Sequence, residues 1–263
     1  MALLDSEHCG LVGMVHLQPL PGSPGWGGSR SAVIDDAIRD AERLRDGGCD
    51  ALLVENMGDV PYLRGRVEPE TVALMAIVMG RLAAVGLPLG VQVLAGANRE
   101  ALGIAVASGA EFIRCEGFAY GHLADEGWMD ACAGDLLRVR AALGVKVQVW
   151  ADVQKKHAAH ALTADLSLEE LASGYAFSGA DALVITGPAT GARTQVHDAE
   201  RARVAGLPVV IGSGVDPSDA GELASVADAL IVGSSLKAGG HWRGEVELDR
   251  VRRLRDAIDA QSG

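Results

Sequence analysis

The sequence predicts one (β/α)8 barrel, an α/β fold of eight parallel strands that alternate with helices, spanning residues 1–263 as a single domain. Three observations predict this fold. The length of 263 residues is close to the roughly 250 residues that such a barrel typically needs. Short apolar runs recur along the whole chain, with helical patterns between them. No linker or shift of composition marks a domain boundary.

The apolar runs lack strict alternation of polar and apolar residues, which is typical of parallel strands buried on both faces. Eight such runs are expected to be strands: Leu11–His16, Ala51–Glu55, Leu89–Leu94, Phe112–Cys115, Val145–Trp150, Ala182–Thr186, Pro208–Ile211 and Ala229–Val232. A doubly wound open sheet shares these local signals. Eight strand–helix units in this length favour a closed barrel instead.

The segments between the runs carry the signals of helices. Apolar residues recur at three- and four-residue spacing over residues 34–44, which predicts the first helix. Helix-end signals flank this and later segments: Gly47 after the first, Pro69 at the start of the second, a capping box at Ser167–Glu170 before the fifth, and Asp216-Pro217 at the start of the seventh.

Composition and charge exclude several classes of protein. The net charge of −12 argues against nucleic-acid binding, which rewards a basic surface. No apolar stretch approaches 18 residues, so no transmembrane segment is predicted. The first residues carry neither a basic segment nor a long apolar run, so we expect no secretory signal and a cytoplasmic location.

The four cysteines do not indicate a metal site or a disulfide framework. Cys9, Cys49, Cys115 and Cys132 form no CxxC pair, and their spacing matches no zinc motif. We expect them to be small core residues in a reducing compartment.

Function in such a barrel collects where the strands end and the following loops begin. Acidic residues and one histidine at these positions are the candidate catalytic groups, namely Glu55, Asp59, Glu116, Asp152 and His157. Converging carboxylates could perform acid–base chemistry, bind hydroxyl groups or hold a divalent cation. The alternative is that one or two of them cap helices or anchor loops.

No cofactor is required by this pattern, and a divalent cation is not specifically indicated. His157 and His160 lack the HExxH spacing of a zinc helix, so no metal site is predicted. Lys156 could form a Schiff base if it were buried with a lowered pKa. As one of two adjacent lysines, it fits an electrostatic or loop role better.

Other polar residues near the strand ends are candidates for contacting a substrate. They are His16, Asn56, Gln92, Arg114, Lys156, Thr186, Thr190 and Gly191.

Glycine and serine recur at the ends of the last two strands, as Gly212-Ser213-Gly214 and Gly233-Ser234-Ser235. Phosphate sites in these barrels commonly lie in those two loops, where glycine admits a phosphate close to backbone N–H groups. Gly-Ser turns are also common without any ligand. Their presence at both strand ends predicts a phosphate site.

Several motifs together resemble one family. They are Gly13–Leu17 with Pro19–Pro24, Glu55–Pro61, Gly109–Arg114, Ala151–Val153 with Lys156–Ala158, Thr186–Gly191, Gly212–Val215 and Ile231–Lys237. The chain resembles the BtpA/SgcQ family over nearly its whole length. The resemblance implies a barrel of the ribulose-phosphate-binding kind. Glu116 departs from it by replacing a usual asparagine, and Gln154-Lys155 replaces a more apolar pair.

These observations lead to two hypotheses about function. The first is an enzyme, a lyase, isomerase or glycosidic-bond hydrolase, acting on a small phosphorylated ligand such as a sugar phosphate or a nucleotide-like molecule. The second, which the family's name in photosystem I biogenesis implies, is a non-catalytic assembly factor for a membrane complex. An assembly factor would need an exposed apolar surface, and the sequence shows none. Trp26, Trp128 and Trp242 are expected in loops, where tryptophans also close ligand pockets. We also expect a homo-oligomer.

Overall fold

The structure is a computed structural model that describes residues 3–4, 8–155, 157–187 and 196–260. Its strands are β1 Gly10–His16, β2 Ala51–Glu55, β3 Leu89–Gln92, β4 Phe112–Cys115, β7 Gln148–Asp152, β9 Ala182–Ile185, β10 Val209–Ile211 and β11 Ala229–Val232. These eight strands form a closed parallel barrel in the order β1-β11-β10-β9-β7-β4-β3-β2. Closure confirms the predicted barrel and excludes the open sheet.

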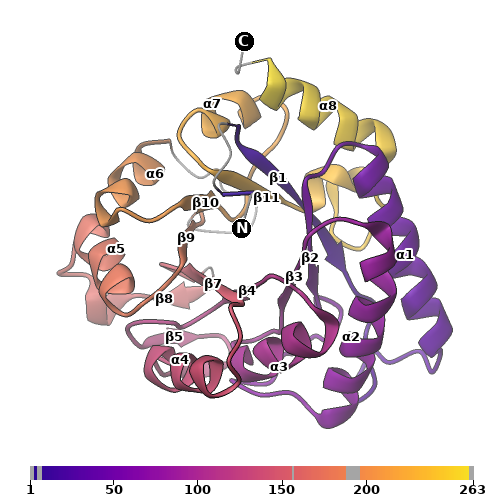
Figure 1. Ribbon diagram of the computed structural model, residues 1–263, viewed down its shortest axis with the longest axis horizontal. Coiled ribbons are helices and arrows are strands. Elements are labelled where there is room, and N and C mark those ends of the chain that lie inside the picture. Colours follow the sequence, from indigo (N-terminus) through magenta and orange to yellow (C-terminus); the bar gives the residue numbers. More distant parts are fainter. Residues whose placement is uncertain (1–2, 5–7, 156, 188–195, 261–263) are drawn as a thin grey trace.

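A ring of helices surrounds the barrel (Figure 1). The α-helices are α1 Arg30–Asp46, α2 Pro69–Leu82, α3 Asn98–Ser108, α4 Ala133–Ala142, α5 Leu168–Phe177, α6 Val196–Ala202, α7 Ala220–Ala224 and α8 Leu248–Asp259. Short 3-10 helices are η1 Ala83–Val85, η2 Ala161–Thr163, η3 Arg203–Ala205, η4 Ser234–Leu236 and η5 Ala238–Gly240. The capping box at Ser167 and Glu170 is confirmed, and Pro69 begins α2 as predicted.

The seventh helix does not begin at Asp216-Pro217 as predicted. The Asp216 carboxylate instead accepts from the Ser218 N–H at 2.8 Å and from its hydroxyl at 2.5 Å, which holds a turn. α7 therefore starts only at Ala220 and has five residues.

Two strands have bounds that differ from the prediction by two residues or more. β3 ends at Gln92 because the N–H of Leu94 donates to the side chain of Asn56, at 2.7 Å, instead of to a neighbouring strand. The predicted strand at Val145–Trp150 is shifted to Gln148–Asp152. Asp152 pairs with Val184 and is thus the last residue of β7, not the first residue of a loop.

A small antiparallel sheet was not predicted. It comprises β5 His122–Ala124, β6 Gly127–Met129 and β8 Ala158–Ala159, in the order β6-β5-β8. It joins the loop after β4 to the loop after β7. Its strands have two or three residues, too few for any periodicity to be read, and Trp128 lies in β6 instead of a loop.

Alternation along each barrel strand separates two cores. Outward residues such as Val54 and Ile113 pack under the helices, whereas Leu53, Phe112 and Trp150 fill the barrel interior. The rings of Phe112 and Trp150 stack with centroids 3.9 Å apart. Gly90 makes room for this stack, because a Cβ there would lie 2.2 Å from the Phe112 ring.

The same alternation positions the site. Side chains alternate between two faces along a strand, so the residue two positions beyond an interior residue also points inward, at the carboxyl end. At or just beyond the ends of β1, β2, β3, β4, β7, β9, β10 and β11 these positions are His16, Glu55, Gln92, Arg114, Asp152, Thr186, Gly212 and Gly233.

Candidate functional site

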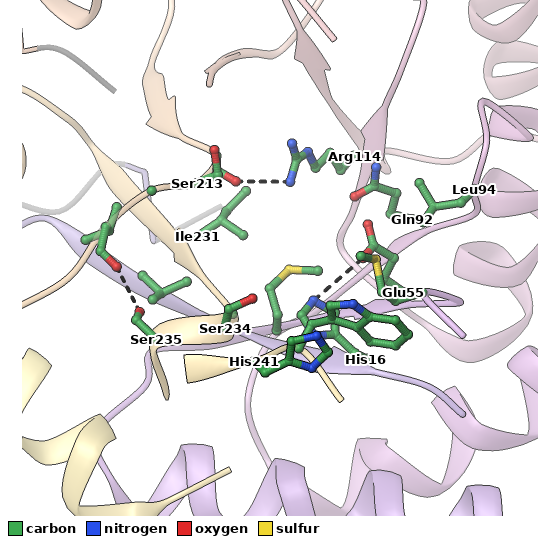
Figure 2. A pocket seen from close by; sticks show the side chains of 18 of the residues that line it. His16, Glu55, Gln92, Leu94, Arg114, Ser213, Ile231, Ser234, Ser235 and His241 are labelled. Carbon is green, nitrogen blue, oxygen red and sulfur yellow. Dashed lines mark hydrogen bonds and ion pairs between the residues drawn. The ribbon is translucent and has the colours of Figure 1, made fainter. Parts of the chain in front are cut away.

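A cavity of about 860 Å³ opens at the carboxyl ends of the strands. Most of the predicted candidates line it, namely His16, Glu55, Gln92, Arg114, Glu116, Asp152, His157, Gly212, Ser213, Gly214, Gly233, Ser234 and Ser235. Figure 2 shows Glu55, Gln92 and Arg114 on one side of it and the three serines on the other. The cavity therefore has a carboxylate end and a Gly-Ser end.

His16, Glu55 and Gln92 stand side by side because they are register partners on β1, β2 and β3. The Nε2 atom of His16 lies 3.7 Å from an Oε2 atom of Glu55 (Figure 2). Burial, with the charges of Lys237 and Arg114, lowers the pKa of His16 to about 3. His16 is thus a neutral imidazole at neutral pH and does not compensate the charge of Glu55.

Arg114 and Asp152 form a buried two-bond ion pair across β4 and β7. The Arg114 Nη2 and Nε atoms donate to the two Asp152 oxygens at 2.8 and 3.0 Å. A third bond runs from Nη1 to the carbonyl of Gly212, at 3.3 Å. Breaking such a pair leaves a buried charge uncompensated, so Asp152 holds Arg114 in place as well as facing the cavity.

Glu116, Lys155 and Glu126 form a second charged group at the carboxylate end. The Lys155 ammonium lies 2.7 Å from Glu126 and 3.7 Å from the Oε2 atom of Glu116. Burial raises the pKa of Glu116 to about 7, although the charge of Lys155 opposes the shift. Glu116 and Lys155, at two of the positions where the resemblance implied a departure from the family, thus lie next to each other.

Lys155 was not predicted as a site residue. Burial alone would lower the pKa of Lys155, but the neighbouring Glu116 and Glu126 raise it above its usual value. Lys155 is therefore protonated at neutral pH. Its neighbour Lys156, predicted instead, lies outside the described residues, as do Thr190 and Gly191.

The glycines of the Gly-Ser end have a packing role that the sequence did not reveal. A Cβ on Gly233 would lie 2.8 Å from the Cε1 atom of His16, and one on Gly212 would lie 3.1 Å from Nη2 of Arg114. Both glycines thus leave space for side chains that reach across the barrel. Gly214, with φ +74°, turns the loop.

Two arginines of α8, Arg250 and Arg253, line the cavity beside the Gly-Ser end and were not predicted. Arg250 pairs with Glu247 and donates to the carbonyl of Ser235 at 3.4 Å. Arg253 forms no ion pair with any of the described residues. They escaped the prediction because it considered only strand ends.

Three predicted residues do not line the cavity. Asn56 follows the inward Glu55 and so points outward, where it donates to Asp59 at 2.9 Å. Asp59 accepts from the N–H of Leu20 at 2.7 Å, which ties the loops after β1 and β2 together. Thr186 donates to the carbonyl of Gln154 at 3.0 Å. These three side chains anchor loops, the alternative that the sequence left open.

The covering loop after β11 brings an aromatic side chain. Trp242 lines the cavity and meets His16 edge to face, with centroids 6.4 Å apart. Arg243 lies over the Trp242 ring, 4.2 Å from its centre. His157, at the other rim, is exposed and has φ +53°.

Two further features concern only the described part of the chain. No group of three or more His, Cys, Asp and Glu side chains there is arranged to hold a metal ion. No helix there combines the length and apolar character that crossing a membrane would require.

The closed parallel barrel with its pocket at the carboxyl ends of the strands defines a TIM-barrel protein. Its fold is similar to that of thiamine phosphate pyrophosphorylase from Pyrococcus furiosus, with a TM-score of 0.61, 15% identity and 97% of each chain covered. N-(5'-phosphoribosyl)anthranilate isomerase from the same organism gives a TM-score of 0.56 at 12% identity, covering 96% of this chain and 100% of that one. At these identities the likeness concerns the fold alone.

The chain belongs to the BtpA family, whose profile it matches over residues 7–260. It is 39% identical over 260 residues to an uncharacterized mitochondrial protein of Caenorhabditis elegans, covering 96% of this chain and 94% of that protein. It is 37% identical over 257 residues to the photosystem I biogenesis protein BtpA of Synechocystis, covering 95% and 88%.

Proposed function

We propose that the protein is an enzyme acting on a phosphorylated small molecule, a sugar phosphate or a nucleotide-like compound. The observation that carries the proposal is Glu116, a buried carboxyl group whose pKa is raised to about 7 at the wall of a large cavity. A group that titrates near the operating pH is suited to donate and accept protons. A scaffold has no need for such a group.

The Gly-Ser end is the proposed phosphate site. Ser234 and Ser235 begin the 3-10 helix η4, so their N–H groups have no intrahelical acceptor. Ser213 and Gly214 follow the neighbouring strand β10 and line the same end of the cavity. Arg250 and Arg253 supply positive charge from α8. Together these groups fit an oxyanion better than any other class of ligand.

The carboxylate end is the proposed site of proton transfer. Asp152, tied to Arg114, stays in one orientation, whereas the buried Glu116 has an Oε2 atom without a hydrogen bond and a pKa raised to about 7. Two carboxyl groups in such different surroundings have separate roles, one as acid and one as base or orienting group. Glu55 and His157 complete the proposed proton-handling set.

Acid–base chemistry of this kind serves isomerisation, cleavage of a carbon–carbon bond next to a carbonyl, and glycosidic cleavage alike. Covalent catalysis through Lys155 is disfavoured, because an imine requires a neutral amine and Lys155 is held as a cation by Glu116 and Glu126.

The test is a screen of phosphorylated metabolites for a rise in melting temperature, followed by turnover assays of the compounds that bind. In Glu116→Gln we expect turnover to fall about 10²–10⁴-fold. The control is Glu111→Gln, at the opposite end of β4 and exposed, which should keep full turnover. If no phosphorylated compound shifts the melt, the proposal is wrong.

The second candidate is a non-catalytic biogenesis factor. The observation that favours it is the 37% identity to a protein named for photosystem I biogenesis. In that case a membrane complex would accumulate less in cells lacking the protein, and Glu116→Gln would restore it as well as wild type. Failure of Glu116→Gln to restore it would instead favour the enzyme.

A homo-oligomeric state and a cytoplasmic location stay predictions. Sedimentation analysis and fractionation of the source cells would test them.

A further inference from the structure

The carboxylate end of the cavity holds two buried acceptors that the described residues leave without a hydrogen bond. They are the Oε1 atom of Gln92 and the Oε2 atom of Glu116. Gln92 is 3% exposed and Glu116 is 6% exposed. Lys155 is 3.7 Å from the Glu116 oxygen, too far for a hydrogen bond. Buried acceptors without a donor are costly. A bound ligand that donates hydrogen bonds would remove this cost.

The two cations at this end are already engaged. Arg114 donates two hydrogen bonds to Asp152 and a third to the carbonyl of Gly212. Lys155 contacts Glu126 at 2.7 Å. Both side chains keep further N–H donors, but a protein carboxylate already compensates the charge of each.

The carboxylates outnumber these cations. Besides Glu116, Glu126 and Asp152, the lining includes Glu55 and Asp125. His16 adds no positive charge, because its pKa is lowered to about 3 by burial and by Lys237 and Arg114. The end is therefore net negative and repels an anion.

The opposite end carries two cations beside the Gly-Ser loops, Arg250 and Arg253, and one lining carboxylate, Asp216. A ligand with one phosphate and one uncharged end has only one favourable orientation in such a cavity. Hydroxyl groups are uncharged and donate to amide and carboxylate oxygens, whereas an ionised second phosphate or carboxylate only accepts.

Resting on the proposed function, we infer that the ligand is a phosphate monoester whose other end is uncharged and rich in hydroxyl groups, and that the carboxylate end excludes a second anion. Gln92 and Glu116 are the residues that determine this specificity. The Gly-Ser end binds the phosphate group that all such esters share. The carboxylate end determines which of these esters bind tightly.

The test is calorimetric titration of the full-length protein with five probes: inorganic phosphate, ethyl phosphate, ethanolamine phosphate, ribose 5-phosphate and ribose 1,5-bisphosphate. We expect ribose 5-phosphate to bind about 10-fold or more tightly than ethyl phosphate, from hydrogen bonds to buried acceptors. We expect the bisphosphate to bind about 10-fold or more weakly than ribose 5-phosphate, from repulsion by the carboxylates.

Two variants with matched controls locate the effect. Gln92→Leu should bring ribose 5-phosphate and ethyl phosphate to within about 3-fold of each other, because an acceptor is removed, and the exposed Gln154→Leu should not. Glu116→Gln should reduce the ratio of the dissociation constants of the bisphosphate and ribose 5-phosphate about 5-fold or more. Glu111→Gln should leave this ratio unchanged.

The outcomes separate this inference from the function on which it rests. If phosphate esters bind but the bisphosphate binds as tightly as ribose 5-phosphate, the inference is wrong and the phosphate site stands. Tighter binding of ethyl phosphate or ethanolamine phosphate than of ribose 5-phosphate also overturns it. If none of the five probes binds, the proposed phosphate site is wrong, and the inference is wrong with it.

Discussion

Glu116→Gln should make the protein more stable at alkaline pH while it removes activity. The Glu116 carboxyl has a pKa raised by burial from 4.5 to about 7. At 1.36 kcal/mol per pKa unit, ionising this buried group costs the native state about 3 kcal/mol relative to the unfolded chain. Glutamine has nearly the same shape and carries no charge, so the variant does not incur this cost.

The sign follows from proton binding. Between pH 4.5 and about 7 the native state holds the Glu116 proton and the unfolded state has lost it. Wild-type stability therefore falls as pH rises through this window, and the loss is complete above it. The stability difference between Glu116→Gln and wild type should grow by about 2.5 kcal/mol from about pH 5 to about pH 8.

The assay is urea unfolding followed by tryptophan fluorescence at the two pH values, for wild type, Glu116→Gln and the exposed Glu111→Gln. A melting experiment should show the same change as about 5–10 °C in a protein of this size. Glu111→Gln should give a difference that does not vary with pH. If the stability difference between Glu116→Gln and wild type is also independent of pH, or shrinks as pH rises, the reasoning is refuted. In that case the charge of Lys155 has a larger effect on the pKa of Glu116 than burial has.

Three further predictions concern other parts of the site. Asp152→Asn should lower the free energy of unfolding by about 3–5 kcal/mol, because Arg114 loses its buried partner; an unchanged urea midpoint would contradict this. Gly233→Ala should cost about 1–3 kcal/mol by pushing against His16 and should weaken phosphate binding in calorimetry. Cys132, whose pKa is lowered by a hydrogen bond from the neighbouring thiol, should be the first cysteine that iodoacetamide alkylates in the folded protein, as mass spectrometry of timed samples would show.

The sequence alone sufficed for the architecture because the signals that specify a barrel are local. Each buried parallel strand is a short apolar run, and each helix has its own period and caps, such as the capping box at Ser167. Eight such units in one chain of this length leave few closed arrangements. A strand ended earlier than predicted where a side chain accepted a hydrogen bond from a backbone N–H group, as Asn56 does from Leu94.

The sequence also placed the pocket, since polar residues at strand ends mark the functional face of a barrel. It did not separate Glu55, which lines the cavity, from Asn56 and Asp59, which anchor loops. Strand alternation carries this information, because the residue after an inward one points outward. That rule can be applied only where the strand boundaries are known.

Only the tertiary structure decided the charge balance of the site. Lys155 comes to Glu116 through a loop held by the small antiparallel sheet, and Arg250 and Arg253 come from a helix that follows the last strand. The raised pKa of Glu116 depends on burial by all of its neighbours together. Contacts between residues far apart in the chain, and the exclusion of water around them, have no local signature in the sequence, and they arise only when the barrel closes.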